Sequence, residues 1–228
     1  MDVFITFEAM KKYTLLFIAL FIVSCSSEEE ELPFYVADNG VTIKARDWVT
    51  VGTTADLNGV TYTAVDLPSL KEWIKAGKDY SKVVTTKVET LGVSPVAALF
   101  QLVPNSFSQI IKGIEGWDVS NWTNLESLFY HGNPVESDLS NWDVSKVANM
   151  GLTMQLGTVN ININNWDVSS ATSMAGLFIR TTSNYIEGMD LSGWDVSKVT
   201  DCQGLTNNFN AYNWPESKRP NFTNCNPD

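Results

Sequence analysis

The sequence has few of the residue types on which enzyme sites depend. It contains one histidine, His131, among 228 residues, and charged residues make up only 18%. A single histidine makes a multi-histidine metal site or a conventional Ser/His/Asp relay hard to build. The sequence also lacks a phosphate-binding glycine loop, a Cys-x-x-Cys pair and a His-Glu-x-x-His motif. We therefore predict that the protein is not an enzyme and uses no cofactor or metal.

Positive charge is scarce as well. Lys and Arg number 15 against 26 Asp and Glu, which gives a net charge of -11. Such a chain repels the phosphate backbone, so nucleic acid is excluded as a partner. Hydrophobic residues nevertheless make up 44%, which is enough to form a core.

The N-terminus has the layout of a secretion signal. Lys11 and Lys12 precede an apolar run of residues 13–23, and the segment Ile22-Val23-Ser24-Cys25 stands where this run ends. The run is too short to cross a bilayer, which needs about 20 residues, and charge followed by an apolar stretch is typical of a cleaved signal. The last four residues resemble a bacterial lipobox. This resemblance implies that residues 1–24 are removed and that Cys25 carries the lipid.

Residues 25–33 are expected to be an acidic tether. Two serines and four consecutive acids follow Cys25, and such a block stays solvated and extended. The block also resembles the export signal of Bacteroidota surface lipoproteins, which implies an outer-membrane protein that faces the cell surface. The residues concerned are Ser26, Ser27, Glu28, Glu29, Glu30 and Glu31.

Trp-Asp-Val-Ser occurs four times, at spacings of 25, 24 and 28 residues, and this repeat is the main signal in the sequence. We expect the tryptophans to form a stacked core and the aspartates to brace turns, in preference to forming a ladder of cation ligands. The core positions are Trp117, Trp142, Trp166 and Trp194, and the turn positions are Asp118, Asp143, Asp167 and Asp195.

Apolar residues follow each motif at intervals of three or four. In the second copy they are Val147, Met150 and Met154, and this period predicts a short helix after each motif. The motif serine precedes the helix and is expected to be its N-cap. The pattern therefore predicts an α/β repeat of about four to five coils, each consisting of an extended segment, a turn and a helix.

These repeats, with Val-x-x-Met and Leu-Phe positions after the motif, resemble the BspA-like leucine-rich-repeat surface lipoproteins of Bacteroidota. The resemblance covers about residues 82–210. It implies a short leucine-rich-repeat-like solenoid, attachment to the cell surface, and a role in binding or adhesion.

The remaining segments are expected to cap the repeats. Residues 34–81 contain Asn39-Gly40 and Asn58-Gly59, which predict hairpins, and Asp66, which is expected to cap a helix over about Leu67–Ala76. The repeats fill residues 82–213, and residues 214–228 form a C-terminal cap. Cys202 and Cys225 either form a disulfide or stay apart, since Cys202 also fits a buried repeat position.

Taken together, the sequence predicts a non-enzymatic, lipid-anchored surface protein that binds a protein partner through its repeats. Two alternatives remain. One is an accessory lipoprotein subunit of an outer-membrane barrel complex, because a lipid tether raises the local concentration of the domain. The other is an enzyme that acts on glycans, which is supported only by the expected location at the cell surface.

Overall fold

The computed structural model describes residues 31–90, 96, 99–103, 110–129, 134–154, 162–179, 186, 188–206 and 213–227. The chain divides into two compact units, Met1–Leu32 and Pro33–Asp228. Cys25, Ser26, Ser27, Glu28, Glu29 and Glu30 lie outside the described residues, whereas Glu31 is described and exposed. Within the described ranges, no helix is long and apolar enough to cross a membrane.

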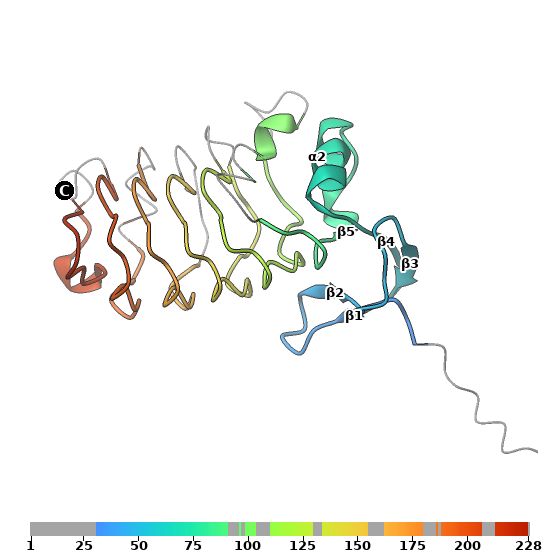
Figure 1. Ribbon diagram of the computed structural model, residues 1–228, viewed down its shortest axis with the longest axis horizontal. Coiled ribbons are helices and arrows are strands. Elements are labelled where there is room, and N and C mark those ends of the chain that lie inside the picture. The colour runs from blue at the N-terminus through green and yellow to red at the C-terminus, as the bar shows by residue number, and fades with distance from the viewer. Residues whose placement is uncertain are drawn as a thin grey trace, which may run out of the picture. The chain divides into compact units, whose positions relative to one another are not determined.

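Two small sheets open the second unit (Figure 1). Strands β1 (Phe34–Val36) and β2 (Ile43–Ala45) form an antiparallel pair. In a second sheet, β3 (Thr54–Leu57) pairs antiparallel with β4 (Val60–Ala64), which pairs in parallel with β5 (Val83–Val84). Asn58 and Gly59, with φ of 54° and 81°, connect β3 to β4 in the left-handed conformation that favours this residue pair.

Helix α2 (Leu67–Lys75) follows β4 and starts in a capping box. The Asp66 carboxylate accepts from the Ser69 backbone N–H at 2.9 Å, while the Asp66 N–H donates to the Ser69 hydroxyl. The helix buries Leu70 and Ile74. Three short 3-10 helices are also described: η1 (Tyr80–Lys82), η2 (Leu99–Leu102) and η5 (Glu216–Lys218).

The Trp-Asp-Val-Ser repeats consist of turns that pair with one another through single bridges. A parallel ladder runs from Asn124 to Asn149, Ser173 and Asp201, each seven residues after a motif tryptophan. For example, the Met150 N–H donates to the Ser173 carbonyl at 2.9 Å. Successive repeats therefore lie side by side, as Figure 1 shows.

The predicted α/β repeat, a leucine-rich-repeat-like solenoid with a helix in each coil, is wrong. Regular secondary structure among the described residues consists of small antiparallel and mixed sheets with α2 as the one full helix. After each motif the chain instead makes a turn, closed in the second repeat by the Thr153 N–H and the Met150 carbonyl. One residue in each such turn has a positive φ, which stops a helix. These residues are Ser127, Leu152, Gly176 and Gly204.

The motif tryptophans are buried and are also tied to the backbone of the preceding repeat. Trp117, Trp142, Trp166 and Trp194 are at most 5% exposed. The Trp166 indole N–H donates to the Leu139 carbonyl at 2.9 Å, and that carbonyl also accepts from the Trp142 backbone N–H at 3.0 Å. The rings of Trp142 and Trp166 are parallel, with centroids 6.5 Å apart. Packing and hydrogen bonding thus link each repeat to the next.

The C-terminal segment covers the last repeat. Cys202 and Cys225 form a disulfide with Cα atoms 5.9 Å apart. The Leu205 N–H donates to the Pro227 carbonyl at 3.2 Å. Trp214 donates its indole N–H to the Met189 carbonyl at 2.9 Å, so it adds one more indole–backbone hydrogen bond beyond the four motif tryptophans.

Candidate functional site

Each motif aspartate braces a turn through the serine two residues later. Its Oδ1 accepts from the serine backbone N–H at 3.0–3.2 Å in all four copies. In the second copy the Ser145 hydroxyl also donates to Asp143 Oδ1 at 2.6 Å. The serine is therefore a donor to the aspartate, and its expected role as a helix N-cap is wrong because no helix follows it.

The aspartates of the second, third and fourth motifs are exposed: Asp143, Asp167 and Asp195. We call these three residues the carboxylate row. The hydrogen bond from the Ser169 hydroxyl, followed by that from the Ser169 N–H, lowers the pKa of Asp167. The corresponding bonds from Ser197 lower the pKa of Asp195. Within the described ranges, no three His, Cys, Asp or Glu side chains are grouped to hold a metal ion. The row is a surface of persistent negative charge.

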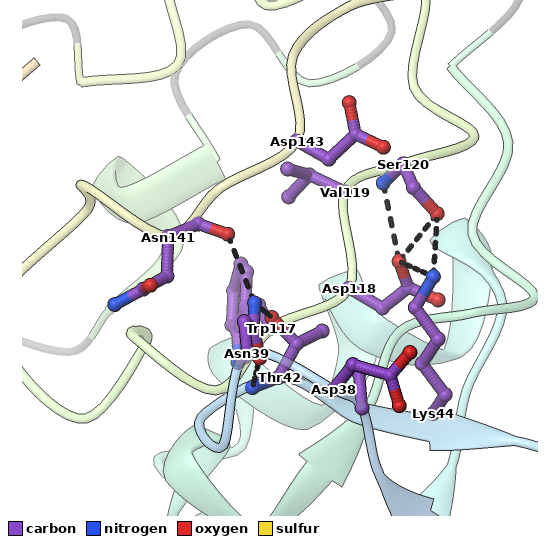
Figure 2. Close-up of a pocket in the computed structure, with 11 residues that line it drawn as sticks. Asp38, Asn39, Thr42, Lys44, Trp117, Asp118, Val119, Ser120, Asn141 and Asp143 are labelled. Carbon is purple, nitrogen blue, oxygen red and sulfur yellow. Dashed lines mark hydrogen bonds and ion pairs between the residues drawn. The ribbon is translucent and has the colours of Figure 1, made fainter. Parts of the chain in front are cut away.

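The first motif aspartate, Asp118, is in a different environment. Its side chain is 2% exposed, and Lys44 of β2 places Nζ 3.7 Å from its Oδ1. The same Nζ donates to the Ser120 hydroxyl at 3.3 Å, and that hydroxyl donates to Asp118 Oδ1 at 2.6 Å. Figure 2 shows these three side chains meeting, with Asp38 and Asp143 on opposite sides of them. Asp118 Oδ2 is buried and has no hydrogen-bond partner.

A cavity of about 270 Å³ opens at this point between the β1–β2 hairpin and the first two repeats. We call it the hairpin pocket; its polar lining includes Asp38, Asn39, Lys44, Asp118, Ser120 and Asp143. Two contacts besides those of Lys44 hold the hairpin against the repeats. The Ile43 N–H donates to the Gly116 carbonyl at 2.9 Å, and the Asn39 amide donates to the Asn141 carbonyl at 3.4 Å.

The arrangement of Lys44, Ser120 and Asp118 does not single out a nucleophile. The hydroxyl-to-carboxylate bond of Ser120 recurs at Ser145 with the same 2.6 Å length, so it belongs to the repeat turn. Lys44 Nζ lies 3.7 Å from Asp118 Oδ1 and donates to the Ser120 hydroxyl, so it takes no proton from that hydroxyl in this arrangement. His131 lies outside the described residues. The geometry favours binding of a ligand over reaction with it.

The sequence identified half of this site. Asp118 and Asp143 belong to the repeated motif, whereas Asp38 and Lys44 were missed. Lys44 is 74 residues from Asp118 in the chain, and no local pattern connects a strand lysine with a distant turn. The alternation in β2 could have placed Lys44 on one face of the hairpin without identifying what that face contacts.

A family model described as "Mycoplasma protein of unknown function, DUF285" matches residues 96–219, more than half of the chain. No curated protein and no solved structure matches the chain. The resemblance to the BspA-like leucine-rich-repeat lipoproteins of Bacteroidota is therefore wrong as a family assignment. The finding that overturns it is the match to a different family, for which no function is known.

Proposed function

Because the chain belongs to DUF285, a family of unknown function, we propose its function from its own residues. The protein is a non-enzymatic, lipid-anchored surface protein that binds a protein partner through its repeat region. The observation that carries this proposal is the carboxylate row, Asp143, Asp167 and Asp195, which successive repeats present at the same position of the motif.

Repetition makes the carboxylate row a suitable binding surface. Bridged rungs lie about 4.8 Å apart, so the row presents several carboxylates at a close and regular spacing. The field of Asp195 opposes the ionisation of Asp167, but the serine hydrogen bonds outweigh it and the pKa of Asp167 is lowered. A row that stays ionised attracts a basic protein surface, and such complementarity gives specificity and rapid association.

The anchor is proposed from the sequence around Cys25. A lipid on Cys25, followed by the acidic tether, would hold the repeats close to the outer membrane, on the side that faces the cell surface. Several acyl chains together give stable membrane attachment. A tethered domain meets partners in its own membrane at a raised effective concentration.

The test is purification of the full-length protein from its own membranes in a gentle detergent, followed by quantification of the proteins recovered in fixed proportion. The test variant carries D143N, D167N and D195N. Asparagine keeps the Oδ1 acceptor for the turn and removes only the charge. The matched control carries D47N, E72Q and E89Q, three exposed acids that precede the four Trp-Asp-Val-Ser copies, so that both variants lose the same charge.

We expect a stoichiometric partner to be recovered with the wild type and the control and to be lost with the row variant. Salt should weaken the binding of this partner because exposed charges are screened. Recovery of the wild type alone, or a partner that the row variant retains, would contradict the proposal. Hydrolysis of surface glycans that one Asp or Glu substitution abolishes without unfolding would contradict its non-enzymatic part. A barrel protein as the partner would identify the protein as a subunit of a membrane complex.

A further inference from the structure

The hairpin pocket has two walls, and both are held in place without a ligand. One wall is the β1–β2 hairpin, where Asn39 Oδ1 accepts from the Val41 and Thr42 backbone N–H groups at 3.0 and 2.9 Å. The other wall is the first motif turn, where the Thr85 hydroxyl donates to the Asp118 carbonyl at 2.9 Å. A site built from such braced segments loses little conformational freedom when it binds.

The pocket carries an excess of negative charge. Its lining holds three carboxylates, Asp38, Asp118 and Asp143, and one cation, Lys44. Lys44 lies next to Asp118 Oδ1, so it offsets one of the three charges. The remaining charge favours a cationic ligand.

Asp118 is also incompletely paired. Its Oδ1 accepts from the Ser120 N–H and hydroxyl, while Oδ2 is buried and has no hydrogen-bond partner. A buried charged acceptor without a donor is costly. Asp143, Asp167 and Asp195 occupy the equivalent position in the other repeats and are exposed, so water can solvate them. Asp118 thus needs a donor that the later repeats do not need.

The volume of the pocket limits the size of the ligand. A volume of about 270 Å³ is slightly below the range of about 300–1,000 Å³ typical of small-molecule sites. It suits one small polar group with a short stem. We propose that the hairpin pocket binds an organic cation with N–H donors, a primary ammonium or a guanidinium group, which pairs with the Asp118 carboxylate between Asp38 and Asp143. This group is carried either by a small molecule or by a Lys or Arg side chain of a protein.

The proposal shares Asp143 with the carboxylate row, but it is tested separately from the function proposed above because Asp38 and Asp118 lie outside the row. Its test is calorimetric titration of the full-length protein in detergent micelles with methylguanidinium, ethylammonium and tetramethylammonium. The last probe has the charge but no N–H donor. Two variants remove charge from the pocket, D118N and D38N. The matched control is D190N, because Asp190 makes the same bonds to the serine two residues later, Ser192, and lies outside both the pocket lining and the carboxylate row.

We expect saturable one-to-one binding of methylguanidinium or ethylammonium, with tetramethylammonium at least about tenfold weaker because it cannot donate to Asp118. D118N should weaken binding by at least about tenfold, D38N should weaken it measurably, and D190N should leave it unchanged. If D118N does not fold, D38N decides, because Asp38 is exposed and its replacement leaves the core intact.

Absence of saturable binding in the wild type, equal binding of tetramethylammonium, or an equal loss in D190N and D38N would overturn the proposal. A further titration separates the two sources of the cation. A short peptide with one central arginine that binds much more tightly than methylguanidinium identifies a protein side chain as the ligand. Equal affinity of the two identifies a small molecule.

Discussion

Replacement of Trp166 by phenylalanine tests whether the motif tryptophans hold neighbouring repeats together. Trp166 is 5% exposed, lies parallel to Trp142 at 6.5 Å, and donates its indole N–H to the Leu139 carbonyl at 2.9 Å. Phenylalanine keeps an aromatic ring at this position but removes the donor and part of the ring. The Leu139 carbonyl still accepts from the Trp142 N–H at 3.0 Å, so no buried acceptor is left unpaired.

Three terms set the expected cost of W166F. The lost hydrogen bond contributes about 1 kcal/mol. The smaller ring buries roughly 40 Å² less apolar surface, which contributes about 1 kcal/mol. The void left behind, roughly 40 Å³, contributes about another 1 kcal/mol. We therefore expect the free energy of unfolding to fall by about 3 kcal/mol.

The measurement is urea denaturation followed by far-UV circular dichroism, with the slope of the transition compared between variants. The matched control is W48F, because Trp48 is 58% exposed and should change stability by no more than about 0.5 kcal/mol. If W166F costs less than about 1 kcal/mol, or no more than W48F, the indole–carbonyl bonds do not stabilise the repeats and the reasoning fails.

Four further outcomes can be measured. G204A should cost about 1 kcal/mol of unfolding free energy, because Gly204 has a φ of +62° and an added Cβ meets nothing within 4 Å, which leaves only backbone strain; a neutral result would contradict the left-handed turn. C225S should lower stability by about 3 kcal/mol in the absence of reductant, and equal urea midpoints for both proteins would show that the Cys202–Cys225 bond does not constrain the unfolded chain. The Ser69 hydroxyl and N–H lower the pKa of Asp66, so its contribution to stability is present above the unfolded pKa of about 3.9 and is lost as the pH falls through the lower folded value; D66N should flatten this acid limb of the urea midpoint, and an unchanged limb would contradict the cap. C25S should abolish metabolic acyl labelling, and retained label would exclude Cys25 as the anchor.

Local chemistry made parts of the fold predictable. Asn58-Gly59 occupies a hairpin turn in which both residues have a positive φ, and this residue pair is the one that such a turn favours. Asp66 caps α2 because its side chain reaches the first free N–H groups of the helix. In both cases the deciding interactions lie within a few residues along the chain, so the sequence pattern contains them.

The helices expected in the repeats failed for a physical reason. Val147, Met150 and Met154 have a helical spacing, but the Val147 N–H closes one turn on Val144 and the Thr153 N–H closes another on Met150. Separate four-residue turns bury the same positions as a helix does. Leu152 has a φ of 55°. Leucine rarely adopts this left-handed conformation, so the sequence does not predict it here. The contact between Lys44 and Asp118 was equally hidden, since tertiary packing alone brings the two together.

The constant register of the parallel ladder allows one whole repeat to be removed or added by a change in the gene. Bridge residues follow their tryptophans at a constant offset, and Asn-Trp begins both the second and the third motif. Deletion of residues 142–165 would join Asn141 to Trp166 and place every later side chain in the register it already has. An in-frame loss or duplication of one such cassette changes the length of the carboxylate row and leaves both ends of the array as they are. Recombination between copies therefore changes the number of carboxylates in the row one period at a time.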